Sequence, residues 1–440
     1  MSNSPETAAP ANVALSSPVT AGPRCERPVD HQFPSTKSTL DDLAIFGGPP
    51  AFAERLHVGR PNIGDAERFI DRVRDVFDRR WLSNHGTYLA QLEERVVTLV
   101  GCRHAIGVAN ATLGLQIACR ALDLTGEVIV PSFTFAATAH SLAWEGLQPV
   151  FCDVAPATHN LDPAHVVKLI SPRTSAILGV HLWGLPCAID ELAGIASDHN
   201  LKLFFDAAHA LGCSYRGQPI GNFGALEVFS LHATKFVNAF EGGIICTNDD
   251  ALARRVRMLA NFGYGEGEIP EIVGTNAKMH EASAAMGLTN LESLGEFVAV
   301  NRRNYHAYRA QLASVDGVRV IDYPEREDHN YQYVVVEIDG ARATLTRDEL
   351  LELLTAEKVL ARRYFFPGVH RLAPYRATDG AAARLPVTER LCESVLLLPT
   401  GTTVSVADIQ RVAELIRFAL LHGASIRARR ASEMGAAATI

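Results

Sequence analysis

Residues 201–248 read LKLFFDAAHALGCSYRGQPIGNFGALEVFSLHATKFVNAFEGGIICTN and contain three short apolar runs. The first run ends at Asp206, the second ends at Ser230 shortly before Lys235, and the third follows a glycine pair. Runs of this length predict buried strands, and ligands of open α/β sheets bind at the carboxyl ends of the strands. The stretch therefore predicts a site with one carboxylate and one lysine at a sheet edge. That combination suggests an aldehyde cofactor held as a Schiff base.

The segments around this stretch alternate between helical and strand-like patterns. Strand-like runs at 104–110, 126–132, 148–154 and 174–184 are separated by apolar helical segments. This rhythm predicts an α/β domain with a mostly parallel sheet covered on both faces. Before it, the spacing over 66–81 predicts a helix with these residues on one face: Phe69, Ile70, Val73, Val76 and Phe77.

A change of composition near Gly317 predicts a smaller C-terminal α+β domain, in which VRVIDY, YQYVVVEI and LARRYFF read as strands. The ends of the chain are rich in small residues and poor in large apolar ones, which is typical of disorder. We therefore expect a disordered tail at 1–37, a large domain with an N-terminal arm at 38–300, a small domain at 301–425 and a second disordered tail at 426–440.

Composition excludes several classes of function. The chain has 440 residues, 48% of them apolar and 20% charged, with a net charge of −8, so nothing predicts a basic surface for nucleic acid. No apolar run approaches the length of a membrane helix, and the first residues do not resemble a signal peptide. Eight scattered cysteines predict buried thiols rather than disulfides or a metal site. We expect a cytoplasmic protein that binds no nucleic acid and no membrane.

Taken singly, the candidate site residues keep two interpretations. Asp206 could hold a pyridine nitrogen or cap the next helix, and Lys235 could be a desolvated nucleophile or an ordinary surface lysine. Thr112, between a strand and a helix in NATLG, could bind a phosphate or simply cap that helix. His209 could act in catalysis or only in packing, and Phe135 could stack on a flat cofactor or belong to the core.

One resemblance explains these signals together. The motifs occur in the order NATLGL (110–115), PSFTFAAT (131–138), GVHLWG (179–184), FFDAAHALG (204–212), FSLHATKFVNAFEGG (229–243) and GTNAKM (274–279). In that order they resemble the DegT/DnrJ/EryC1/StrS family of sugar aminotransferases over roughly residues 40–425. The resemblance implies a pyridoxal 5'-phosphate enzyme with the type I fold of such transferases.

The resemblance also implies a role for each site residue. Lys235 would form the Schiff base and then move a proton between cofactor and sugar. Asp206 would pair with the pyridinium nitrogen, and His209 would lie near the ring hydroxyl. The other implied contacts are Phe135 stacked on the ring, Ala111, Thr112 and Ser230 on the phosphate, Asn276 on the phosphate of a neighbouring subunit, and Tyr331, Phe366 and His370 near the sugar nucleotide. Ala111 departs from the Gly or Ser of many relatives, so only its backbone would contribute.

Within the family, VGRPN (58–62), WLSN (81–84) and YFFPGVH (364–370) are most similar to the C4 aminotransferases of the desosamine and calicheamicin pathways. This implies a homodimer that converts dTDP-4-keto-6-deoxy-D-glucose to dTDP-4-amino-4,6-dideoxy-D-glucose with L-glutamate, in antibiotic sugar biosynthesis. The alternatives are amino transfer to C3, the opposite configuration at C4, and a catalytically silent cofactor-binding regulator. A nicotinamide enzyme lacks support, because no Gly-x-Gly-x-x-Gly turn follows the first strand.

Overall fold

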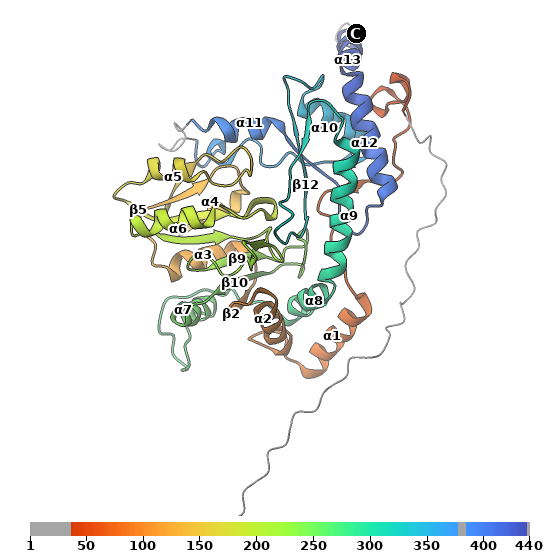
Figure 1. The fold of residues 1–440 in the computed structure, drawn as a ribbon. Helices are drawn as coiled ribbons and strands as arrows, with labels where there is room; N and C mark the ends of the chain where they lie inside the picture. Colours follow the sequence, from red (N-terminus) through yellow and green to blue (C-terminus); the bar gives the residue numbers. More distant parts are fainter. Residues whose placement is uncertain (1–36, 377–383, 438–440) are drawn as a thin grey trace, which may run out of the picture.

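The computed structural model describes residues 37–376 and 384–437, and its centre is a seven-stranded sheet of order β2-β10-β9-β6-β5-β3-β4 (Figure 1). The strands of this sheet are β2 (His104–Val108), β3 (Glu127–Pro131), β4 (Gln148–Cys152), β5 (Thr174–Val180), β6 (Lys202–Asp206), β9 (Glu227–Ser230) and β10 (Gly243–Thr247). Only β10 runs antiparallel to its neighbours. The prediction of a mostly parallel α/β sheet is confirmed.

Helices cover both faces of this sheet, because alternate side chains of its strands are apolar on both sides. On β6, Phe204 packs into one apolar cluster, while Leu203 and Phe205 pack into the other. The first cluster contains residues of α3 (Ala111–Ala121), α4 (Ala136–Trp144) and α7 (Asp250–Ala260). The second contains residues of α2 (Thr87–Val100), α5 (Pro163–Leu169), α6 (Ile189–Asp198) and α8 (Glu281–Glu292).

The C-terminal part is built on a three-stranded antiparallel sheet, β11 (Val318–Val320), β12 (Val334–Ile338) and β14 (Val395–Leu398). Its helices are α9 (Leu294–Leu312), α10 (Arg347–Ala356), α11 (Pro386–Ser394), α12 (Val406–Leu421) and α13 (Gly423–Ala437). The long helix α9 leads from α8 into this part (Figure 1). The domain boundary expected at 300/301 falls inside α9, so no break in the chain marks it.

The N-terminal arm is tied to the C-terminal part by a buried carboxylate. Glu357 accepts the backbone N–H groups of Ala44 and Ala51 and pairs with Lys37. The arm contains the short helical turns η1 (Leu40–Asp42) and η2 (Ala44–Phe46) and the strand β1 (Leu56–His57), which pairs with β13 (Val359–Leu360). The remaining short elements are β7 (Ser214–Tyr215), β8 (Gln218–Pro219), η3 (Leu182–Gly184) and η4 (Val369–Arg371).

Two expectations for the C-terminal part are wrong. Of the predicted strand LARRYFF (360–366), only Leu360 lies in a regular strand, β13; Arg362 adds an isolated bridge to Leu397, and the chain turns from Tyr364. The tail expected from residue 426 is helical to Ala437 in α13. Arginines dock this helix, since Arg427 pairs with Glu349 and Arg430 with Glu352. Composition missed these contacts because their partners lie far away in the sequence. The tail expected at 1–37 lies outside the described residues except for Lys37.

The first long helix, α1 (Ala66–Arg79), carries the apolar face that its spacing predicts, but little of this face is covered. Val76 is buried, whereas Ile70 and Phe77 are exposed.

Elsewhere in the chain, the seven cysteines that the structure describes are all buried and free, as predicted. Among the described residues, no helix has the length and apolar content needed to cross a membrane.

Candidate active site

The parallel strands bring the predicted site residues to one cavity. Strands β6 and β9 end at Asp206 and Ser230, and parallel strands expose their carboxyl ends at the same sheet edge. A cavity of about 650 Å³ lies there. Seven predicted site residues line it: Ala111, Thr112, Phe135, Asp206, His209, Ser230 and Lys235. Figure 1 shows this sheet edge facing the C-terminal part of the chain.

One end of the cavity is suited to an anion. Helix α3 begins here, and Asn110 caps it by accepting the N–H of Leu113 at 2.9 Å. The first N–H groups of a helix lack partners within it, so those of Ala111 and Thr112 are available to a phosphate, assisted by the helix dipole. The hydroxyls of Thr112 and Ser230 line the same cavity. Gly243 of β10 permits the close approach, since a Cβ there would lie 2.7 Å from the nitrogen of Ala111.

A buried carboxylate lies in the cavity wall. Oδ2 of Asp206 accepts a hydrogen bond from the Thr138 hydroxyl at 2.8 Å, and Oδ1 accepts the N–H of Ala208 at 3.1 Å. Burial raises the pKa of Asp206, while these two bonds and the charge of Lys235 oppose that rise. A carboxylate with two fixed donors and a raised proton affinity is suited to hold a protonated ring nitrogen.

The lysine lies in the turn that links β9 to β10. The backbone N–H of Lys235 donates to the carbonyl of His232 at 2.8 Å, and the side chain is only partly exposed in the cavity wall. Burial lowers the pKa of Lys235 to about 8, although the charge of Asp206 favours the protonated form. An amine with this pKa is partly neutral near pH 8, and the neutral form attacks a carbonyl.

A neutral histidine completes this part of the wall. Nδ1 of His209 accepts the backbone N–H of Trp183 at 3.3 Å, and Nε2 lies 3.5 Å from the Tyr333 hydroxyl. Burial and the charge of Lys235 lower the pKa of His209 well below its usual range. On another side of the cavity, Phe135 precedes α4 and leaves 61% of its surface exposed, which suits stacking on a flat ring.

Four predicted site residues do not line the cavity in this chain. Tyr331 is buried between Tyr305 and Tyr323, with ring centroids 5.2 and 5.0 Å away. Phe366 lies against Arg363, and His370 is buried beside Ser132. Asn276 is exposed and lies opposite Asn261.

Three close sequence neighbours line the cavity instead: Tyr333, Tyr364 and Phe365. Tyr331 has a φ of 49°, in the left-handed region, which interrupts the extended alternation that would place its side chain on the same side as that of Tyr333. No local sequence pattern reveals such a conformation at a non-glycine residue. The substrate contacts predicted for Tyr331, Phe366 and His370 therefore stay predictions without support from the cavity lining.

A basic cleft adjoins the cavity and was not found from sequence. This cleft of about 760 Å³ meets the main cavity at Thr234, next to Lys235. Its lining includes five basic or titratable nitrogen side chains and one carboxylate: Arg55, His57, Arg60, Lys358, Arg362 and Glu54. Arg55, Arg60 and Arg362 form no ion pair with any residue that the structure describes. Unpaired guanidinium groups in a concave surface favour a phosphate-bearing ligand.

Pyridoxal phosphate fits these groups. The start of α3 suits its phosphate, Asp206 its ring nitrogen, His209 its ring oxygen, Phe135 its ring face and Lys235 its aldehyde. These are the recurring protein contacts of that cofactor, a lysine Schiff base and an acidic partner for the pyridinium nitrogen. The fold and the site together define a pyridoxal-phosphate transferase of fold type I.

Comparison with known proteins identifies the family. Residues 64–417 match the DegT/DnrJ/EryC1/StrS aminotransferase family, and the chain belongs to it. A dTDP-4-amino-4,6-dideoxy-D-glucose transaminase from Escherichia coli is 32% identical over 364 residues, covering 82% of this chain and 98% of the relative. A GDP-perosamine synthase from Caulobacter vibrioides is 35% identical over 368 residues, covering 81% of this chain and 96% of the relative.

A solved structure is more similar still in sequence. DesI, crystallised in the presence of its TDP-sugar product, is 53% identical, with a TM-score of 0.86. The match covers 89% of this chain and 100% of the DesI chain. The family relationship predicted from the motifs is therefore confirmed.

Proposed function

We propose that this aminotransferase converts dTDP-4-keto-6-deoxy-D-glucose to dTDP-4-amino-4,6-dideoxy-D-glucose, with L-glutamate as amino donor and pyridoxal phosphate as cofactor. The observation that carries the proposal is the joint occurrence of Lys235 and Asp206 in one cavity of a chain 53% identical to DesI. The reaction balances, because glutamate loses its amino group to become 2-oxoglutarate and the sugar carbonyl gains that group.

The chain's own groups have distinct tasks in this reaction. When bound, pyridoxal phosphate carries the amino group between donor and sugar and supplies an electron sink. Asp206 keeps the ring nitrogen protonated. Nζ of Lys235 accepts and returns a proton as a general base and acid, which its pKa of about 8 permits. Phe135 and the start of α3 orient the ring and the phosphate.

The basic cleft supports a nucleotide-linked sugar over a free sugar. A nucleoside diphosphate carries two negative charges or more, and Arg55, Arg60 and Arg362 offer guanidinium groups next to the lysine turn that pair with no described carboxylate. Guanidinium groups bind phosphate oxygens through paired N–H donors. The cleft does not distinguish the base, and the 35% identity to a GDP-perosamine synthase makes a GDP-linked keto sugar the second candidate substrate.

Exposed apolar side chains support a homodimer. Phe69 of α1 contacts Phe240 at a centroid distance of 5.6 Å, and Phe240, Ile70 and Phe77 all remain exposed in the single chain. Large apolar side chains gathered in one region favour burial against a partner. In such a dimer Asn276, exposed beyond α7, is the residue that we propose to reach the phosphate of the other subunit.

The test is product analysis with purified protein. We expect incubation with dTDP-4-keto-6-deoxy-D-glucose and L-glutamate to give one amino sugar and an equal amount of 2-oxoglutarate. NMR coupling constants of the product give the aminated carbon and its configuration. Amination at C3 or the opposite C4 configuration would replace the proposed product. Turnover only with a GDP-linked keto sugar would establish the second candidate. A protein that binds the cofactor but aminates none of these sugars would favour the silent-regulator alternative over the proposed reaction.

A further inference from the structure

A buried hydrogen-bonded line connects the cavity to the opposite side of the domain junction. The indole Nε1–H of Trp183 donates to Nδ1 of His159 at 3.1 Å, and Nε2 of His159 lies 2.9 Å from Oε1 of Glu337. Since Nδ1 of His159 accepts, its Nε2 carries the proton and donates to the carboxylate. Trp183 and His159 are fully buried, and Glu337 nearly so. Through His159, these bonds join η3, the turn that follows β5 of the large sheet, to β12 of the C-terminal sheet.

At its inner end, this line defines the tautomer of His209. Nδ1 of His209 accepts the backbone N–H of Trp183, so the proton of the neutral ring lies on Nε2. Nε2 is also the nitrogen nearer to Tyr333 in the cavity wall. The Trp183 ring lies nearly parallel to the His209 ring, at 15° with a centroid distance of 6.1 Å. One residue therefore contacts His209 through both its backbone and its ring.

The backbone of Trp183 has a conformation that requires support. Its φ of 63° and ψ of 4° lie in the left-handed region, which is unfavourable for a bulky non-glycine residue. Three contacts oppose that cost. The indole bonds His159, the ring stacks on Phe365 at 5.3 Å, and the carbonyl accepts the Tyr323 hydroxyl at 3.0 Å.

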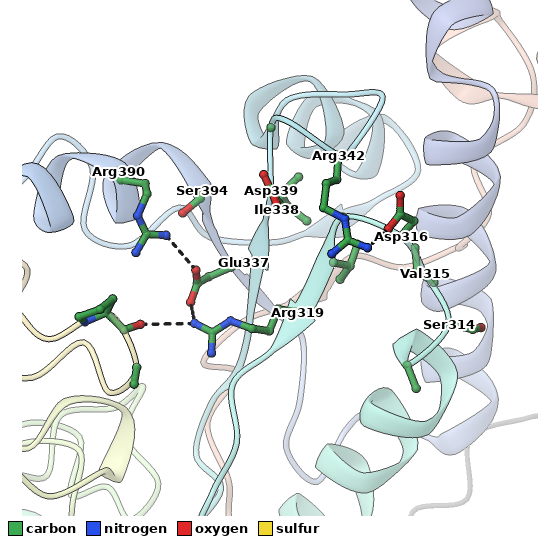
Figure 2. Close-up of a pocket in the computed structure, with 16 residues that line it drawn as sticks. Ser314, Val315, Asp316, Arg319, Glu337, Ile338, Asp339, Arg342, Arg390 and Ser394 are labelled. Atoms are coloured by element: carbon green, nitrogen blue, oxygen red, sulfur yellow. Dashed lines mark hydrogen bonds and ion pairs between the residues drawn. The ribbon is translucent and has the colours of Figure 1, made fainter.

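At the outer end, Glu337 is held by two arginines. Arg319 and Arg390 both pair with Glu337, and Arg319 also donates to the carbonyl of Pro156, as Figure 2 shows. These residues line a surface groove of about 1010 Å³. Arg342 and Asp316 form another ion pair in the same groove. The arginines of the groove already pair with carboxylates, so the groove has little excess charge for a ligand. Its ion pairs instead hold Glu337 in place at the end of the hydrogen-bonded line.

We propose that Trp183 is a positioning residue for His209. The line from Glu337 through His159 holds the Trp183 backbone N–H against Nδ1 of His209, so that Nε2 presents a proton to the cofactor's ring oxygen. This inference rests on the proposed function only in naming the cofactor. A donor at that oxygen withdraws electron density from the Schiff-base nitrogen with which it shares a proton. Loss of the donor therefore moves the pH midpoint of the cofactor's visible absorption band upwards.

The test begins with Trp183→Phe, which keeps the backbone N–H and an aromatic ring but removes the indole donor. In cofactor-free protein labelled with ¹⁵N-histidine, two-bond ¹H–¹⁵N correlations report the tautomer of each ring. We expect His209 to show the Nε2–H form in the original chain and both tautomers in the variant. In the cofactor-loaded protein, we expect the band midpoint to rise by about one pH unit, the weight of one hydrogen bond.

Controls separate positioning from packing. Trp144→Phe removes an indole that is 81% exposed and should leave both readouts unchanged. Glu337→Gln keeps an acceptor for His159 and should retain most of the Nε2–H form. In a His209→Gln background, Trp183→Phe should no longer move the band midpoint.

Two results would overturn the proposal. One is an unchanged His209 tautomer in Trp183→Phe, and the other is the same shift of the band midpoint with and without His209. If Trp183→Phe does not fold, Tyr323→Phe takes its place. This variant removes the hydrogen bond to the Trp183 carbonyl, and the same spectra report its effect on His209. A protein that takes up no cofactor would refute the proposed function, while the cofactor-free spectra would still decide the role of Trp183.

Discussion

The hydroxyl of Thr138 in α4 lies 2.8 Å from Oδ2 of Asp206 at the end of β6, so two elements jointly hold the carboxylate. This bond favours the ionised form of Asp206, against the burial that raises its pKa. We expect Thr138→Val to lower kcat about tenfold or more, because a hydrogen bond to a charged group contributes about 1.5–3 kcal/mol. Steady-state kinetics measure the change. Thr138→Ser, which keeps the hydroxyl, is the control, and an equal loss in that variant would argue against the bond.

Lys235 should lower the stability of the cofactor-free protein. Its folded pKa of about 8 lies below the ordinary lysine pKa of 10.5, so the penalty appears as the pH falls from 10.5 towards 8 and is complete below 8. We expect Lys235→Met to abolish turnover. The same variant should raise the free energy of unfolding at pH 7 by up to about 3 kcal/mol, an upper bound from the pKa difference.

Urea unfolding of the cofactor-free protein at pH 7 and pH 10 measures that gain, which should shrink at the higher pH. The exposed Lys168→Met is the matched control and should change neither activity nor its pH dependence of stability. Retained sugar amination in Lys235→Met would refute the assignment of the lysine.

Uptake of the cofactor should depend on pH through the same amine. Only the neutral form of Lys235 attacks the aldehyde, and its fraction rises as the pH passes about 8. We therefore expect the rate of reconstitution with pyridoxal phosphate, followed by the visible band, to rise several-fold between pH 7 and pH 9. A rate that is constant over this range would show that another step limits uptake or that the lysine is already neutral at pH 7.

The basic cleft should act on the sugar half of the reaction alone. Replacing Arg55, Arg60 or Arg362 with Gln removes a guanidinium group from the cleft. We expect KM for the nucleotide sugar to rise about tenfold for each replacement, the usual weight of one charge-assisted contact. The rate of the half-reaction with glutamate, measured from the absorption change of the cofactor, should be unchanged. Arg326→Gln, outside the cleft, is the control, and an equal loss in both half-reactions would contradict this role.

The apolar surface around Phe77 should be a subunit interface. Phe77 is 65% exposed in the single chain, and a charged residue at a buried interface leaves an unpaired charge there. We expect Phe77→Asp to shift the protein from dimer towards monomer in sedimentation at micromolar concentration, with loss of activity. Leu421→Asp, at a leucine at the end of α12 that is 76% exposed, should leave the dimer intact. A monomeric original chain would refute the interface.

Local pattern was sufficient for the strands of the large sheet, most of the helices and the centre of the site. The runs that end at Asp206 and Ser230 are β6 and β9, and the glycine pair that follows Lys235 leads into β10. These features were predictable because each depends on periodicity and on residues close in sequence. Where partners were distant, as for α13 with Glu349, composition alone predicted disorder wrongly.

The sequence by itself thus determined the class of fold, the family and the pairing of a carboxylate with a lysine. The tertiary structure alone decided which aromatic residues reach the cavity, Tyr333 rather than Tyr331, and where the arginines of the basic cleft gather. It alone also decided the position of the proton on His209. That position depends on Trp183, which is 26 residues away in the sequence, and on the bond between His159 and Glu337, which are 178 residues apart. The physical reason is that hydrogen bonds, burial and charge act through space, and folding sets those distances.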